Sequence, residues 1–294
     1  MDNFGQSTVL VRALASRGVF ASHPFTLIDI GSRGGIDPAW KLFGSNLVAF
    51  GFDPNVSECA RLQARESSPS IRYIPAFVGL PPSDPFRQRV GEQLWSRNPW
   101  HRLSASRSVE SRRRSLAAVR GPKRDLTWDR DTYVERGQTL VLSEFLANEE
   151  ISEVDFVKVD VDGEDLVVLT SLQDHLGPWG VLGLSVEVNY FGSARPEDNT
   201  FHNVDRLLKS RQFEIFDVSS RRYSTSALPD RFVGSSPGPT RRGRVLQGDA
   251  TYLRDLADPA IRRAQEWAPP KILKLCASSI SSAWATAPPS CSSS

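Results

Sequence analysis

Short runs of hydrophobic residues recur along the first 253 residues, and stretches with helical spacing separate most of them. Their side chains are mainly those of valine, isoleucine, leucine and phenylalanine, as in strands that are buried on both faces of a sheet. Strands that alternate with helices indicate a doubly wound α/β sheet with mostly parallel strands. We predict strands at residues 25–30, 47–52, 71–78, 154–161, 181–190, 213–218 and 250–253.

The segments between these strands carry helix-start signals. Asp37 followed by Pro38 has the form of an N-cap with proline at the first helical position. Asn55 is placed to cap the next helix, which is expected to end near Arg65. Other helices are predicted at residues 140–148, 163–172 and 201–209, with a short amphipathic one within residues 5–20.

Residues 155–165 read D-F-V-K-V-D-V-D-G-E-D and depart from the apolar pattern of the other strands. One side of this strand carries Phe156, Lys158 and Asp160 in alternation. An unpaired buried charge is costly, so these groups must be paired or must meet a ligand. Ligands of parallel sheets bind at the carboxyl ends of the strands, where Asp160 lies. The stretch therefore predicts a functional site.

A glycine turn follows the first predicted strand and reads D-x-G-x-x-x-G, from Asp29 through Gly31 to Gly35. Glycines at this place allow a tight turn and a close approach of the backbone to a ligand. The second strand ends at Asp53, 22 residues after Gly31, an offset at which an acid accepts hydrogen bonds from ribose hydroxyls. The pattern lacks the G-x-G-x-x-G of dinucleotide-binding proteins. We expect a ligand that contains a nucleoside.

Composition adds few constraints. Hydrophobic residues make up 39% of the 294 residues and charged residues 24%, as in ordinary globular proteins. The net charge of +2 points to no polyanionic partner, and we expect no nucleic acid. The N-terminus lacks the features of a secretory signal, and the three cysteines lack metal-ligand spacing. A cytoplasmic protein without a bound metal and without a transmembrane segment is therefore expected.

Two segments differ from the rest in composition. Residues 86–130 contain 12 lysines and arginines and four acids, which predicts either a solvated insertion or a surface that contacts anionic groups. The last 24 residues contain eight serines and no acid, which predicts a flexible end. The expected organisation is an N-terminal helix (1–23), one domain (24–255) with an arginine-rich insertion (83–130), and a flexible tail (256–294).

Four segments carry a family resemblance: L-I-D-I-G-S-R-G-G, A-F-G-F-D-P-N, D-F-V-K-V-D-V-D-G-E-D-L-V-V-L and L-S-V-E-V-N-Y-F. Over roughly residues 25–220 the chain resembles the FkbM-type S-adenosylmethionine-dependent methyltransferases. The resemblance implies a Rossmann-like class I fold with seven strands, of which the last is antiparallel. It implies O-methylation of a sugar, glycan or natural-product hydroxyl. The implied cofactor-binding residues are Asp29, Gly31, Gly35, Asp53, Phe77 and Val78.

Methyl transfer to a hydroxyl is an in-line displacement that requires alignment of the reactants and removal of a proton. In the expected strand order 3-2-1-4-5, Lys158 and Asp160 would neighbour Asp29 on one side and Glu187 and Asn189 on the other. Asp160 is the first candidate for the base and Glu187 the second, and His202 is a more distant third. Lys158 is expected to belong to the same catalytic cluster.

Several alternatives stay open. Lys158 and Glu187 could form a purely architectural ion pair, and Asp162 could cap the helix that begins near residue 163. A metal held by Asp160, Glu187 and Asn189 is conceivable but not expected. Two other function classes compete: a nicotinamide-dependent oxidoreductase, and a non-catalytic module that binds a glycan or an anionic surface.

Overall fold

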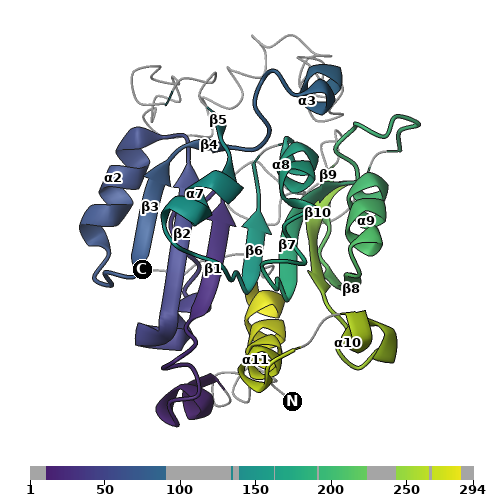
Figure 1. Ribbon diagram of the computed structural model, residues 1–294. Helices are drawn as coiled ribbons and strands as arrows, with labels where there is room; N and C mark the ends of the chain where they lie inside the picture. Colours follow the sequence, from purple (N-terminus) through teal and green to yellow (C-terminus); the bar gives the residue numbers. More distant parts are fainter. Residues whose placement is uncertain are drawn as a thin grey trace.

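A central β-sheet crosses the protein, and helices pack against both of its faces (Figure 1). The computed structural model describes residues 11–90, 134, 139–161, 163–190, 192–223, 243–264 and 267–285. The sheet has eight strands, and seven of them follow the order β3-β2-β1-β6-β7-β10-β8. These are β3 (Ile71–Pro75), β2 (Leu47–Asp53), β1 (Phe25–Ile30), β6 (Phe156–Val159), β7 (Gly183–Asn189), β10 (Arg244–Leu253) and β8 (Glu214–Val218).

The strand order and directions agree with the prediction. Strands β3, β2, β1, β6 and β7 are parallel, and β10 runs antiparallel to both β7 and β8. The short strand β9 (Arg221–Tyr223) also pairs with β10, which the sequence did not predict. The predicted strand 71–78 is two strands, because the chain leaves β3 and forms a separate small sheet between β4 (Phe77–Val78) and β5 (Thr139–Leu140).

Most predicted helices are present, with shifted ends. The N-cap prediction for Asn55 is confirmed, since its side chain accepts a hydrogen bond from the Glu58 amide at 2.9 Å. Asp37 is not an N-cap: it accepts from the Ala39 amide (2.8 Å), and a 3-10 helix starts at Trp40. The helices are η1 (Trp40–Asn46), α2 (Val56–Arg65), α3 (Pro85–Val90), α7 (Leu142–Asn148), α8 (Asp165–Leu172) and α9 (Phe201–Ser210), and residues 11–16 are also helical.

Part of the expected flexible tail is helical. Helix α10 (Pro259–Ala264) follows the last strand, and α11 (Pro269–Ala285) lies at the edge of the sheet where the parallel strands begin (Figure 1). The serine-rich composition misled the prediction, because the helix is held by two buried lysines, Lys271 and Lys274, which face Asp155. None of the helices in the described ranges is long and apolar enough to span a membrane.

Two hydrophobic cores cover the two faces of the sheet. One contains side chains of α7, α8 and α9, and the other contains those of η1, α2 and α11. Along β1 the alternation is complete: Ile28 and Ile30 face the first core, and Phe25 and Leu27 face the second. This is the doubly wound arrangement that near-continuous apolar strands predict. It places the carboxyl ends of the parallel strands together at one edge, the upper edge in Figure 1.

Candidate active site

The glycine turn after β1 bends toward the end of the neighbouring strand β2. The amides of Gly31 and Ser32 both donate to the Phe52 carbonyl oxygen, at 2.8 and 3.0 Å. Gly31, Gly34 and Gly35 have φ angles of +90°, +91° and +100°, a region that side chains with a Cβ rarely adopt. The glycine pattern seen in the sequence therefore has a conformational cause, and it places exposed backbone at the carboxyl edge.

Gly31 also packs directly on the end of β6. A Cβ at this position would lie 1.8 Å from the Asp160 carbonyl oxygen, whereas a Cβ at Gly34 would meet nothing within 4 Å. Gly31 and Gly34 have nearly the same φ angle, and only Gly31 lies against Asp160. Alanine substitutions at the two positions can therefore be compared directly.

Replacing Gly31 with alanine is expected to destabilise the protein by about 2–4 kcal/mol, since backbone strain and overpacking each cost about 1–3 kcal/mol. Gly34→Ala introduces the same backbone strain without overpacking, so it should lower the free energy of unfolding by about half as much. Urea-induced unfolding monitored by circular dichroism measures both changes. Equal losses in the two variants would contradict the contact between the turn and β6.

An ion-pair cluster joins β1 and β6 beside this turn. Asp29 and Lys158 are register partners, and the Lys158 ammonium lies 3.2 Å from Asp29 Oδ1 and 3.6 Å from Asp160 Oδ2. Burial raises the pKa of Asp29, and the neighbouring ammonium only partly offsets this effect. Burial disfavours the charge on Lys158, but the two carboxylates outweigh it and raise the Lys158 pKa. The predicted contact of the polar strand with Asp29 is thus confirmed.

The hypothetical ion pair between Lys158 and Glu187 is wrong. Lys158 is opposite Ser185, so Glu187 lies two residues further along β7 and faces Asp249 on β10. Its carboxylate accepts from Arg221 Nη1 at 2.6 Å and from Gln247 Nε2 at 3.0 Å. Arg221 also pairs with Asp249 at 2.7 Å. These partners come from β9 and from the antiparallel strand, whose register no local pattern reveals.

A second buried carboxyl, Asp165, holds the loop between β6 and α8. It accepts from the amides of Val161 (3.0 Å) and Gly163 (3.2 Å) and from the side-chain amide of Asn199 (2.8 Å). Asn199 in turn accepts from the Leu166 amide at 3.2 Å. Burial raises the pKa of Asp165 well above its usual value, and the charge of Glu187 adds to this effect. Asp165 is a functional candidate that the sequence reasoning did not select.

The same asparagine reaches the end of β7. Asn189 donates from its side-chain amide to the Asn199 carbonyl oxygen at 3.2 Å. The loop after β6 and the loop after β7 are therefore joined by buried polar groups. Within the described ranges, no three His, Cys, Asp or Glu side chains are gathered so that they could hold a metal ion. Asp162, the predicted helix cap, lies outside the described residues, and α8 begins at Asp165.

The predicted nucleoside-binding residues lie at the same edge. Asp53, at the end of β2, is buried, and its Oδ1 accepts from the Asn55 amide at 2.8 Å. Phe77 is half-buried and Val78 is buried, in the short strand that continues after β3.

His202, the third candidate for the base, contacts the Ser193 carbonyl oxygen through Nε2 at 3.0 Å.

Helix α3 is tied to the site from above the carboxyl edge (Figure 1). Arg87 lies 3.1 Å from Glu164, which precedes α8, and Arg89 lies 3.4 Å from Glu197 in the loop after β7. Glu164 therefore has a structural partner. Residues 91–130 of the predicted arginine-rich insertion (83–130) fall outside the described residues.

The site carries an excess of acidic groups. Within the part of the site that the structure describes, five carboxyl groups from neighbouring strands and loops lie near two cations; four of them pair with these cations and the fifth is held by amides. Such an excess favours the binding of a positively charged ligand group and disfavours ionisation of the most buried carboxyls. The carboxyls belong to Asp29, Asp160, Asp165, Glu187 and Asp249, and the cations are Lys158 and Arg221.

The strand order and the polar cluster at the carboxyl edge are those of a doubly wound α/β protein with class I methyltransferase topology. Residues 39–215 match the sequence family described as the methyltransferase FkbM domain. Because this match covers more than half of the 294 residues, the chain belongs to that family. The family predicted from the sequence is thereby confirmed.

Solved structures similar to this chain include three methyltransferases of low identity. Magnesium protoporphyrin IX methyltransferase from Synechocystis PCC 6803, with bound SAM, is 9% identical (87% of this chain, 86% of that one, TM-score 0.35). A putative methyltransferase in complex with the Haloferax volcanii Trm112 activator is also 9% identical (86% and 96%, TM-score 0.38). The Burkholderia thailandensis 1,6-didemethyltoxoflavin-N1-methyltransferase, with S-adenosylhomocysteine, is 10% identical (86% and 81%, TM-score 0.33). No curated protein matches the chain.

Proposed function

We propose that this protein is an S-adenosylmethionine-dependent methyltransferase that methylates a hydroxyl group of a sugar, glycan or natural-product acceptor. One observation carries the proposal. The glycine turn after β1, Asp53 after β2 and Asp160 after β6 lie at the carboxyl ends of three adjacent strands. Their chemistry suits a nucleoside cofactor beside a base, and the family of the chain is one of methyltransferases.

The residues present fit the proposed cofactor. Asp53 offers a carboxylate of the kind that accepts from ribose hydroxyls, and Phe77 and Val78 offer an apolar surface for the adenine. The backbone of Gly31 and Gly35 would lie along the methionine part and the ribose. The acidic excess that includes Asp29 would favour the positively charged sulfonium and ammonium groups. When bound, S-adenosylmethionine supplies a methyl group on a sulfur that is a good leaving group.

Asp160 is the proposed base. Its side chain is 38% exposed, whereas Glu187 is only 5% exposed and is engaged by Arg221 and Gln247. The Lys158 ammonium lies 3.6 Å from Asp160 Oδ2. In the proposed reaction an Asp160 oxygen would accept the proton of the acceptor hydroxyl that becomes methylated. Lys158 is then a positioning group that holds Asp29 and Asp160 in place.

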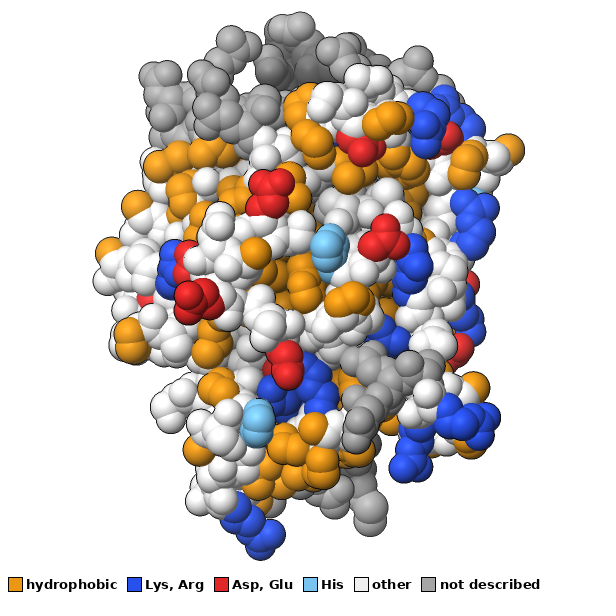
Figure 2. Space-filling view, in the orientation of Figure 1, with side chains coloured by type: hydrophobic (Ala, Val, Ile, Leu, Met, Phe, Trp, Pro, Cys, Tyr) orange, Lys and Arg blue, Asp and Glu red, His pale blue; other side chains and the backbone are white. Residues whose placement is uncertain are grey.

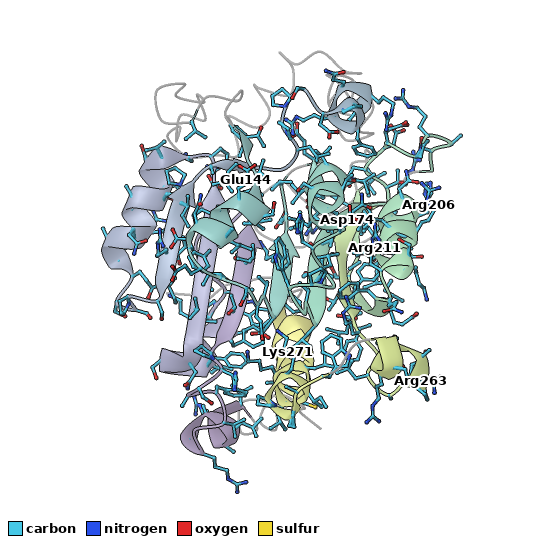
Figure 3. The ribbon with its side chains drawn as sticks, viewed as in Figure 1. Glu144, Asp174, Arg206, Arg211, Arg263 and Lys271 are labelled. Atoms are coloured by element: carbon cyan, nitrogen blue, oxygen red, sulfur yellow. The ribbon has the colours of Figure 1, made fainter. Side chains whose placement is uncertain are left out.

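Calorimetric titration with S-adenosylhomocysteine tests the cofactor assignment. The wild-type protein is expected to bind this compound and not to bind NADH. Asp53→Ala should weaken binding by about 10- to 100-fold, because a hydrogen bond to a charged group contributes about 1.5–3 kcal/mol. Glu144→Ala, which removes an exposed carboxylate on α7 (labelled in Figure 3), should leave the affinity unchanged.

Two results would overturn the proposal. Binding of NADH without S-adenosylhomocysteine would indicate a nicotinamide-dependent oxidoreductase. Binding of neither compound by a folded protein would indicate a module without this cofactor. Circular dichroism of each variant establishes that the fold is retained before affinities are compared.

A further inference from the structure

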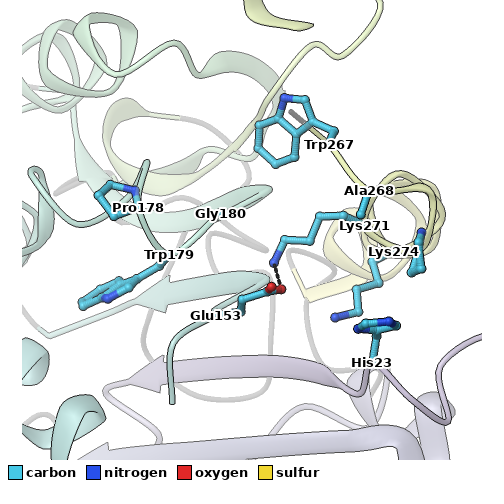
Figure 4. Close-up of a pocket in the computed structure, with 10 residues that line it drawn as sticks. His23, Glu153, Pro178, Trp179, Gly180, Trp267, Ala268, Lys271 and Lys274 are labelled. Atoms are coloured by element: carbon cyan, nitrogen blue, oxygen red, sulfur yellow. Dashed lines mark hydrogen bonds and ion pairs between the residues drawn. The ribbon is translucent and has the colours of Figure 1, made fainter. Parts of the chain in front are cut away.

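A pocket lies at the edge of the sheet opposite the candidate active site, beside the N-terminal end of α11 (Figure 4). Its volume is about 150 Å³. Figure 2 shows lysine or arginine atoms at the bottom of a hollow on this face, in the region where Figure 3 labels Lys271. The lining residues that matter below are His23, Glu153, Trp179, Trp267, Lys271 and Lys274.

The pocket floor contains two lysines that share one fully buried carboxylate. Lys271 Nζ lies 2.6 Å from Asp155 Oδ1, and Lys274 Nζ lies 2.9 Å from Asp155 Oδ2. Asp155 also accepts from the Thr26 amide at 2.8 Å, which anchors it to β1. One buried carboxylate balances only one of the two positive charges.

Glu153 is the second carboxylate beside these lysines, and it is the more weakly held of the two. Glu153 lies 3.4 Å from Lys271, and its side chain is 63% exposed, whereas that of Asp155 is 0% exposed. An exposed carboxylate at this distance contributes little to stability, because water competes for it. An incoming anion can therefore replace Glu153 on Lys271 while Glu153 moves into solvent.

One aromatic ring, that of Trp267, lies on the side of Lys271 in this pocket, whereas the ring of Trp179 points away from it (Figure 4). Trp179 is buried and stacks on His175, with ring centroids 4.9 Å apart. Trp267 is half-buried, and in the described part of the chain its Nε1 is buried without an acceptor. Behind it the Arg254 guanidinium lies 5.6 Å from the indole centroid. The pocket thus combines an indole face with positive charge.

We propose that this pocket binds a small organic anion with a single aromatic ring, such as a monocyclic aromatic carboxylate. The carboxylate takes the place of Glu153 on Lys271, and the ring lies against the Trp267 indole. A volume of about 150 Å³ suits one ring, since an apolar cavity of that size accepts benzene. Lys271 supplies the charge-assisted hydrogen bond that distinguishes an anion from a neutral ring, since Lys274 already donates to Pro24 and Asp155.

This site is separate from the proposed methyl-transfer site. The four residues of β6 lie between the two sites and span roughly 13 Å. A ligand here would contact α11 and the turn at residues 178–180, so its binding would stabilise the docking of that helix. The proposal does not depend on the identity of the cofactor or acceptor.

Calorimetric titration with sodium benzoate tests the proposal, with benzamide as the neutral isostere and sodium acetate as the anion without a ring. Benzoate is expected to bind in a saturable manner and at least about 10-fold more tightly than either control compound, the ratio expected from one charge-assisted hydrogen bond. Lys271→Met should abolish binding, and Trp267→Ala should weaken it. Glu153→Gln should strengthen it several-fold, because the competing carboxylate is removed. The matched change Glu144→Gln should have no effect.

Because Lys271→Met leaves Asp155 with one partner fewer, Glu153→Gln is the decisive variant: it changes an exposed side chain and leaves the buried pair in place. The proposal is overturned if benzoate shows no saturable binding up to about 10 mM, the weak end of specific affinities. Equal binding of benzamide and benzoate would overturn it as well, as would unchanged or weaker benzoate binding by Glu153→Gln.

Discussion

Replacing Asp155 with alanine is expected to lower the free energy of unfolding by about 3–5 kcal/mol, the usual cost of removing one partner of a buried ion pair. Asp155 is fully buried and is paired with both Lys271 and Lys274. Without it, two ammonium groups would lie in a low-dielectric environment with the Glu153 carboxylate as the remaining acid of the cluster. Urea-induced unfolding measures the change.

Glu153→Ala provides the matched control, since it removes the other carboxylate of the same lysine. It should cost less than about 1 kcal/mol, because the Glu153 side chain is mostly exposed. Both variants remove one negative charge beside Lys271, so the difference between their free energies of unfolding measures the effect of burying the carboxylate. A loss below about 1 kcal/mol for Asp155→Ala would show that the stability of α11 does not depend on this ion pair.

The central strands of the sheet could be predicted because their near-continuous apolar sequences identify them without knowledge of their neighbours. Strand β1 begins at Phe25 and ends at Ile30 as predicted, since both of its faces are buried and every residue is constrained. The alternation of strands and helices predicted a doubly wound parallel sheet, and the family resemblance implied the order of its strands. The polar row on β6 was found for the same reason: Lys158 and Asp160 break an otherwise apolar pattern.

The partners of the site residues could not be predicted in the same way. Arg221 reaches Glu187 only because β10 runs antiparallel to β7 and brings β9 beside it. Asn199 holds Asp165 from 34 positions further along the chain, with no periodic pattern to indicate the contact. Such contacts depend on register and loop path, which local propensities do not determine.

Helix α11 illustrates a composition signal that a long-range contact overrides. Its serine-rich sequence predicted a flexible end, yet Lys271, Lys274 and Ala277 recur at intervals of three residues and are all buried. That spacing places them on one face of a helix. The acid that this face meets, Asp155, lies more than 100 residues earlier in the chain. Only the folded sheet brings the two together.

Asp160→Asn is expected to lower kcat by about 10²- to 10⁴-fold, which is the contribution of a positioned general base. The amide keeps the size of the carboxylate and cannot take the acceptor proton. Affinity for S-adenosylhomocysteine should stay within about threefold of wild type, a change of less than 1 kcal/mol. A panel of hydroxylated compounds with a radiolabelled methyl donor first identifies an acceptor, and steady-state kinetics with that acceptor then gives kcat and KM.

Glu164→Gln is the control for this experiment, since Glu164 lies in the same loop and pairs with Arg87 at 3.1 Å. Its kcat should remain within a few-fold of wild type. Full turnover by Asp160→Asn with bound cofactor would remove Asp160 from the role of base, while the proposed cofactor site would stand. A loss of cofactor affinity without a change in kcat would instead assign Asp160 to binding. In the proposed arrangement the largest effect falls on kcat, because Asp160 acts on the proton that leaves the acceptor during methyl transfer.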